Sequence, residues 1–189
     1  MSSGDKRIFK IGVCGPQASG KTSLVSRLAG NPIIDPPPTI GVEFYSKGIQ
    51  GSDLKLHFWD LAGGRQYMYI TDMYIKKLDL MLYTYNTTDQ EQQRELRGLY
   101  QEYEDKGVTR NAILVGTHTE SESQQSTSLV DHLAVENSLP HIRVSSTTGE
   151  NIDVLFRMIT GFHHRAVAVR STPAMRITTK QKEDKCIIL

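Results

Sequence analysis

Residues 15–22 read GPQASGKT, which matches the pattern G-x-x-x-x-G-K-[ST]. They follow an apolar run at residues 8–14 and precede a stretch with helical spacing of apolar residues, so the motif joins a predicted strand to a predicted helix. A chance glycine turn would not require this order. In such a loop backbone N–H groups face an anion, Lys21 reaches the outer phosphates and the Thr22 hydroxyl ligates Mg²⁺. The motif predicts a phosphate-binding loop whose nucleotide contacts are Gly15, Gln17, Ala18, Ser19, Gly20, Lys21, Thr22 and Ser23.

Length and composition indicate a single domain in a reducing compartment. The chain's 189 residues are enough to bury a core, and two cysteines are too few for a disulfide framework. Its 22 Lys and Arg residues nearly balance 21 Asp and Glu residues, so no nucleic-acid partner is expected. The sequence shows no signal peptide and no apolar run near the ~18 residues of a membrane span. Ser2 excludes N-terminal myristoylation, so any membrane attachment is expected at the C-terminus.

Two hydrophobic patterns indicate strands. Apolar and polar residues alternate at 54–59, which predicts a strand with one buried face. Runs at 80–85 and 112–115 lack alternation, which is typical of central parallel strands covered on both sides by helices. Residues 42–49 are expected to pair with residues 54–59 as an antiparallel hairpin.

Amphipathic helices alternate with these strands. Apolar residues at positions 96, 99, 100 and 103 have helical spacing, and the sequence TDQE before them, at residues 88–91, fits a capping box. Further helices are expected at 129–136 and 152–159. The alternation predicts an α/β fold, a single phosphate-loop NTPase G domain at residues 1–165 with a mostly parallel central sheet and helices on both faces. Residues 166–189 lose the periodicity and are expected to form a flexible tail.

Further residues follow the order that a nucleotide switch requires. Asp60 ends a predicted strand, where it is placed to hold Mg²⁺ through water, and Gly63 permits close approach of the backbone to a γ-phosphate. An isolated Asp-x-x-Gly is often only a turn, but its position downstream of a phosphate-binding loop favours the nucleotide site. Thr39 is expected to supply the second protein oxygen to Mg²⁺, after Thr22.

With these residues the sequence resembles a Ras-superfamily small GTPase over residues 8–165. The segments IGVEF at 40–44 and WDLAG at 59–63 are most similar to the Rab branch. The resemblance implies that residues 31–42 and 61–75 form switch I and switch II, which GTP orders and GDP loosens. It also implies effector proteins, an exchange factor and a GTPase-activating protein as partners.

The resemblance further implies an effector surface formed by Phe44, Trp59 and Tyr74. Strand alternation independently places Trp59 on the face shared by Lys55 and His57, where a buried role is hard to arrange. The alternative, that Trp59 only covers a neighbouring strand, stays open.

Two departures from the family pattern affect catalysis. Gly64 stands where the family has its catalytic glutamine, so no side chain at this position orients the attacking water, and Arg65 follows it in place of glutamate. Gln17 stands where the family prefers a small residue, so it is expected to obstruct an arginine finger; partial substitution for the missing glutamine is the alternative. The expected catalytic residues are Lys21, Thr39 and Gly64, and hydrolysis is expected to be slow.

The guanine-recognition motif is also altered, because residues 117–120 read THTE where the family has Asn-Lys-x-Asp. His118 offers an aromatic plane to the base, and Glu120 keeps the carboxylate that pairs with the N–H groups of guanine. The extra methylene of Glu120 is expected to weaken binding by about one to two orders of magnitude. The expected base contacts are Thr117, His118, Glu120, Ser145, Ser146 and Thr147, the last three matching the family's Ser-Ala-Lys motif.

The chain ends in CIIL, which matches C-a-a-X, and the terminal leucine favours geranylgeranyl transfer to Cys186 by a prenyltransferase. Basic residues outnumber acidic ones in the tail and add attraction to anionic lipid. The ending resembles Ras and Rho proteins, whereas Rab proteins usually end in two cysteines. The protein is therefore expected on the cytoplasmic face of a membrane, lipid-anchored, and in the cytosol if unprenylated.

The sequence thus predicts a membrane-anchored switch that binds GTP, GDP and Mg²⁺, contacts effectors in vesicle trafficking or signalling, and hydrolyses GTP slowly. The main alternative is a non-hydrolysing interaction module with the same fold. A small nucleotide kinase is disfavoured because no arginine-rich lid segment is present and because C-a-a-X has no use in such an enzyme.

Overall fold

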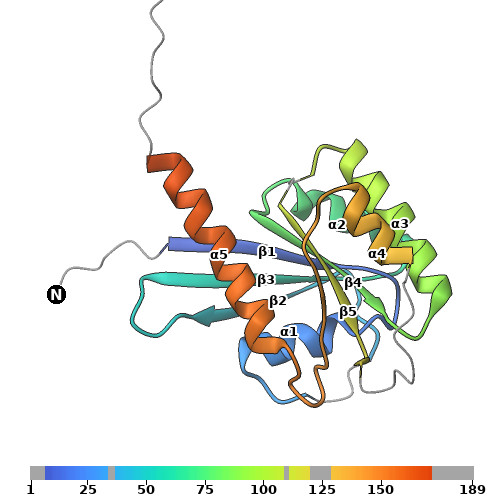
Figure 1. Cartoon of the computed structure of the whole chain (residues 1–189), viewed down its shortest axis with the longest axis horizontal. Helices are drawn as coiled ribbons and strands as arrows, with labels where there is room; N and C mark the ends of the chain where they lie inside the picture. Colours follow the sequence, from blue (N-terminus) through green and yellow to red (C-terminus); the bar gives the residue numbers. More distant parts are fainter. Residues whose placement is uncertain (1–6, 34–36, 109–110, 120–128, 172–189) are drawn as a thin grey trace, which may run out of the picture.

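The computed structural model of the chain describes residues 7–33, 37–108, 111–119 and 129–171, and these form a six-stranded sheet with helices on both faces (Figure 1). The strands are β1 (Arg7–Cys14), β2 (Val42–Gly48), β3 (Leu54–Leu61), β4 (Leu80–Asn86), β5 (Ala112–Thr117) and β6 (His141–Arg143). The helices are α1 (Lys21–Ala29), α2 (Met68–Ile75), α3 (Gln90–Asp105), α4 (Leu129–Glu136) and α5 (Ile152–Ser171), with the short 3₁₀ helix η1 at Arg65–Tyr67.

The sheet has the order β2-β3-β1-β4-β5-β6, and only β2 and β3 run antiparallel to each other. The predicted α/β fold and hairpin are therefore confirmed, with Phe44 opposite Trp59 in the hairpin register. Helix α1 follows β1, and helix α2 follows β3. The two helices lie on opposite faces of the sheet. The loops after these two strands therefore diverge at their carboxyl ends, where ligands of open α/β sheets bind.

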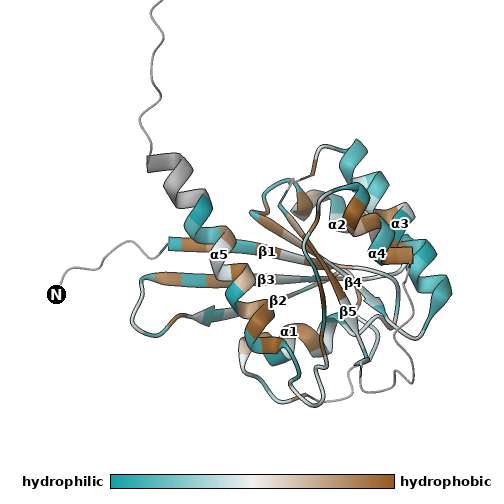
Figure 2. Ribbon diagram, viewed as in Figure 1, coloured by the Kyte–Doolittle hydropathy of each residue, from teal (hydrophilic) through white to brown (hydrophobic). Residues whose placement is uncertain are grey.

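Two hydrophobic cores lie on the two faces of the sheet. On one face Leu24 and Leu28 of α1 pack with Leu155 of α5 against the strands, and each is at most 1% exposed. On the other face α2, α3 and α4 contribute buried residues that include Leu96 and Val130. The hydropathy colours show apolar central strands and a hydrophilic outer surface on α3 (Figure 2). The runs without alternation are thus buried on both sides, as predicted.

The N-cap of α3 is Asp89, one residue later than a capping box at residues 88–91 requires. The carboxylate of Asp89 accepts hydrogen bonds from the backbone N–H of Glu91 at 2.9 Å and of Gln92 at 3.1 Å. Thr88 instead donates its hydroxyl to Asn86 at 2.8 Å. Either residue type suits an N-cap, but the hydroxyl of Thr88 is already paired with Asn86, so Asp89 caps the helix.

Helix α5 runs to Ser171, so residues 166–171 of the expected tail are helical. This segment contains no glycine or proline that would end a helix. Residues 172–189, and with them Cys186, lie outside the described residues, so the lipid anchor stays a prediction. No helix in the described part of the chain is long and apolar enough to cross a membrane.

Candidate nucleotide-binding site

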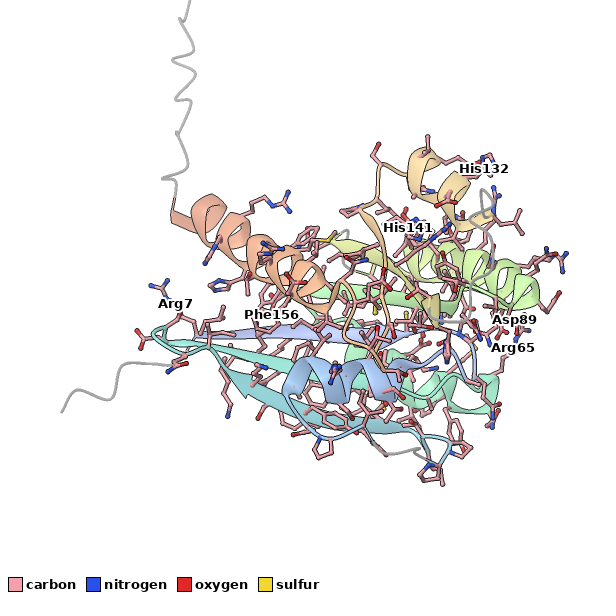
Figure 3. All side chains as sticks on the ribbon, turned by 60° about the horizontal axis from the view of Figure 1, so that its bottom comes forward. Arg7, Arg65, Asp89, His132, His141 and Phe156 are labelled. Carbon is pink, nitrogen blue, oxygen red and sulfur yellow. The ribbon has the colours of Figure 1, made fainter. Side chains whose placement is uncertain are left out.

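A cleft of about 660 Å³ opens at the carboxyl ends of β1 and β3. Figure 3 shows Arg65 and Asp89 at this end of the molecule, opposite Arg7 at the start of β1. The residues that line the cleft are Gln17, Ala18, Ser19, Gly20, Lys21, Thr22, Ser23, Pro37, Pro38, Thr39, Ile40, Gly63, Gly64, Gln66, Tyr67 and His118. The phosphate-binding loop and both expected switch segments therefore meet around one space.

The loop keeps its shape because two of its glycines fill positions that a side chain would disturb. Gly15 has a φ of 150°, and a Cβ there would overlap the backbone carbonyl of Thr84. Gly20 has a φ of 77° and precedes α1 directly, so the N-terminus of that helix faces the cleft. Ser19 is buried, and its hydroxyl lies 3.0 Å from that of Thr84, which fixes the loop to β4.

Lys21 lies inside the loop as its motif predicts. Its side chain is 6% exposed, and Nζ donates to the carbonyl of Gly15 at 3.1 Å and of Pro16 at 2.6 Å. Burial lowers the pKa of Lys21, and the nearby carboxylate of Asp60 opposes that shift. A buried ammonium beside a helix N-terminus suits polyanionic phosphate.

The three expected metal ligands converge from three separate parts of the chain. Thr22 Oγ1 donates to Asp60 Oδ2 at 2.6 Å, and Thr39 Oγ1 lies 3.0 Å from Thr22 Oγ1 and 3.3 Å from Asp60 Oδ2. Asp60 is fully buried, and its Oδ1 has no hydrogen-bond partner among the described residues. Burial raises the pKa of Asp60, while the hydrogen bond from Thr22 and the charge of Lys21 lower it.

This donor set fits Mg²⁺. Hydroxyl and carboxylate oxygens are the hard ligands that Mg²⁺ prefers, usually with one or two carboxylates and substrate phosphates. No group of three or more His, Cys, Asp or Glu side chains stands ready to hold a metal in the part of the chain that the structure describes. Among the residues that the structure describes, the buried Oδ1 of Asp60 is an acceptor without a hydrogen-bond partner.

The two glycines of switch II have different surroundings. A Cβ on Gly63 would lie 2.7 Å from the backbone nitrogen of Gln17 and 2.7 Å from the carbonyl oxygen of Gly15. Gly63 therefore packs directly on the phosphate-binding loop. Gly64 has an ordinary extended backbone, with φ −82° and ψ 134°, and a Cβ there would meet the side-chain amide of Gln66 at 2.7 Å.

The expected base contacts lie beside the loop. Thr117 is buried, and its Oγ1 is 2.9 Å from the Ser19 carbonyl oxygen and 2.8 Å from Nδ1 of His118. His118 has a φ of 63°, and its ring lies over Gly20 and lines the cleft. The hydroxyl of Thr119 donates to Glu150 at 3.2 Å and so joins this loop to the loop after β6. Glu120 itself lies outside the described residues.

The loop after β6 contains the serine motif. Ser145 is fully buried, and its hydroxyl accepts the backbone N–H of Thr148 at 3.0 Å. Ser146 is 8% exposed, and its hydroxyl has no partner among the described residues. The carbonyl of Thr147 accepts a hydrogen bond from Arg27 in the last turn of α1 at 3.2 Å, which ties this loop to that helix. None of Ser145, Ser146 and Thr147 lines the cleft.

Phe44, Trp59 and Tyr74 form a continuous row of rings on the outer surface. Ring centroids are 5.0 Å apart between Phe44 and Trp59 and 5.1 Å apart between Trp59 and Tyr74. Phe44 is 49% exposed and Trp59 is half-buried. A groove of about 370 Å³ beside Trp59 and Tyr74 is bordered by Lys10 and Lys77. Trp59 thus packs against the core beneath it and remains partly accessible.

Some lining residues are not marked by any motif. They flank Thr39 and Gly64 within the two switch segments, and only that position in the sequence points to them. They are Pro37, Pro38, Gln66 and Tyr67.

The chain is similar to known proteins over most of its length. The sequence model of the Ras family matches residues 10–163. The chain is 31% identical over 160 residues to Ras-related protein RabG2 of Dictyostelium discoideum, covering 80% of each chain. It is 29% identical over 174 residues to Ras-related protein Rab-42 of Mus musculus, covering 84% of this chain and 79% of that protein. It is also 29% identical over 161 residues to Ras-related protein RABD2b of Arabidopsis thaliana, covering 81% and 79%.

Proposed function

Because the chain belongs to the Ras family, we propose that it is a Rab-like switch that binds GTP and GDP with Mg²⁺ in the cleft described above. The observation that supports this proposal most is the meeting of Thr22, Thr39 and Asp60 within 3.3 Å, beside the buried ammonium of Lys21. Mg²⁺ at these oxygens would neutralise phosphate charge together with Lys21, and Thr39 would couple switch I to the bound nucleotide.

Titration with fluorescent GDP, GTP and ATP, each with Mg²⁺ and with EDTA, tests this proposal. Mg²⁺ should tighten guanine-nucleotide binding to the wild-type protein. Thr22→Ala should remove that dependence, because it deletes a hydroxyl at the metal site. Thr160→Ala is the matched control, since its hydroxyl donates to the carbonyl of Phe156 on α5, away from the cleft. Binding of GTP that is equally tight with and without Mg²⁺ would contradict the proposal.

The same titration measures base selectivity. We infer a preference for GTP over ATP, because Glu120 keeps the charge that pairs with guanine, and an affinity below the usual family range because its carboxylate must shift. Glu120→Asp should then tighten GTP binding by about tenfold or more, at ~1.4 kcal/mol per factor of ten. Equal affinity for ATP and GTP would remove the case for a guanine site.

Slow hydrolysis is the second part of the proposal. Gly64 offers no side chain to orient water, and Gln17 is exposed on the rim of the cleft, where an arginine finger would enter. The carbonyl of Gln17 accepts Gln92 of α3 at 3.3 Å, which restrains this part of the loop. Without another group to hold the water, the chain would be the non-hydrolysing module that the sequence leaves as an alternative.

The third part of the proposal concerns effector binding and membrane attachment. The row of Phe44, Trp59 and Tyr74 adjoins both switches and would bind effectors in the GTP state, in vesicle trafficking or signalling. Aromatic residues of this kind dominate many binding surfaces. Prenylation of Cys186, with the basic tail, would hold the protein on the cytoplasmic face of a membrane.

A further inference from the structure

We propose that Gln66 replaces the missing glutamine and orients the water that attacks the terminal phosphate of GTP. The inference rests on the proposed nucleotide-binding function and deepens it, because it assigns the residual hydrolysis to a side chain two positions beyond Gly64.

The side-chain amide of Gln66 occupies the space that Gly64 leaves open. A Cβ built on Gly64 would lie 2.7 Å from Oε1, 2.8 Å from Nε2 and 2.9 Å from Cδ of Gln66. A side chain at position 64 and the present position of the Gln66 amide therefore exclude each other. The glycine is not required by the backbone, since φ −82° and ψ 134° suit any residue.

A tight turn brings residue 66 back to this point. The backbone N–H of Tyr67 donates to the carbonyl of Gly64 at 2.9 Å, which closes the turn that begins η1. As a result Gln66 and Gly64 line the same cleft as Lys21 and Thr39. Arg65 is exposed and does not line it.

The side-chain amide of Gln66 has the hydrogen-bonding groups needed to orient a water molecule beside a phosphate. It offers one carbonyl oxygen that accepts a hydrogen bond from water and two N–H donors for a phosphate oxygen. In hydrolysis the water oxygen bonds to the terminal phosphorus while the bond from that phosphorus to the bridging oxygen of GDP breaks. One water hydrogen stays on the phosphate and the other leaves as a proton. Because this chemistry depends on positioning, a neutral amide is sufficient.

A double-mutant cycle separates Gln66 from the other groups in the cleft. Single-turnover phosphate release is measured for the wild type, Gln66→Ala, Gly64→Gln and the double variant, all loaded with Mg·GTP. Gln66→Ala should slow the wild-type rate by about tenfold or more, the scale of losing one positioning group. In the Gly64→Gln background the same change should have little effect, because residue 64 then displaces Gln66 and holds the water. Gln101→Ala, on the outer side of α3, is the matched control and should keep the wild-type rate.

A spectroscopic readout tests the contact without turnover. The side-chain amide resonances of Gln66, assigned by their loss in Gln66→Ala, should shift when Mg·GDP is replaced by a non-hydrolysable Mg·GTP analogue, whereas those of Gln101 should not. A Gln66→Ala variant that binds GTP normally and hydrolyses it at the wild-type rate would overturn the inference and leave the proposed switch intact. So would a loss of rate in Gln17→Ala without one in Gln66→Ala. Failure of the wild-type protein to bind GTP would instead overturn the proposed function.

Discussion

Replacing Gly63 by alanine should destabilise the protein, whereas the same change at Gly64 should not. A Cβ on Gly63 would lie 2.7 Å from three backbone atoms of residues 15–17. Ordinary van der Waals contact for a Cβ begins at 3.4 Å, so each of these atoms would have to move away. Moving backbone atoms of this loop costs more free energy than moving the end of a flexible side chain. Gly63 has no positive φ, so the cost would come from overlap alone.

The magnitude follows from this overlap. Overpacking a well-filled site by one methyl group costs ~1–3 kcal/mol. In a chain of this size ~1 kcal/mol shifts Tm by about 2–4 °C, so Gly63→Ala should lower Tm by roughly 2–12 °C. At Gly64 the methyl group meets only the far end of the flexible Gln66 side chain. The lower entropy of the unfolded chain offsets that contact by ~0.4–1 kcal/mol, so Gly64→Ala should be close to neutral.

Thermal unfolding followed by circular dichroism, in EDTA and without nucleotide, measures the protein contacts alone. Repeating the series with excess Mg·GDP adds the binding contribution, which Gly63→Ala should also reduce because it moves the phosphate-binding loop. Equal changes in Tm for the two variants would refute the claim that Gly63, and not Gly64, packs against the loop backbone.

Three further predictions concern charge, partners and membranes. Burial raises the pKa of Asp60 in the folded protein above its ordinary value. Ionisation of Asp60 therefore lowers the free energy of unfolding as the pH rises from the ordinary pKa to the raised one, and the loss is complete above the raised pKa. Asp60→Asn should therefore raise the unfolding free energy of the metal-free protein at pH 7 and abolish Mg²⁺-dependent nucleotide binding; lower stability in urea titrations at pH 7 would contradict this. Trp59→Ala should weaken GTP-dependent capture of partners by about 30-fold or more, at ~2 kcal/mol for a central aromatic residue, and leave nucleotide affinity unchanged; a pull-down with GTP- and GDP-loaded protein checks both, and loss of the fold would instead support a purely covering role. Cys186→Ser should move the protein from membranes to the cytosol in cell fractionation, and unchanged membrane association would show that other contacts hold it there.

Much of the fold follows from the sequence because its signals are local. The phosphate-binding loop lies between the predicted strand and helix, and the hairpin of residues 42–49 with 54–59 is observed as β2 and β3. The helix predicted at 129–136 has those bounds as α4. In each case the prediction rests on residues close together in the sequence, either glycines in a turn or apolar residues that recur with a fixed period.

Contacts between distant segments were decided by the tertiary structure alone. Periodicity does not show that Thr22, Thr39 and Asp60 lie within 3.3 Å of one another, although the family resemblance implies it. The sequence pattern predicts neither the packing of Gly63 on the phosphate-binding loop nor the position of the Gln66 amide beside Gly64. The first depends on a methyl-sized volume between two segments that the strands bring together, and the second on the turn that the hydrogen bond from Tyr67 to Gly64 closes.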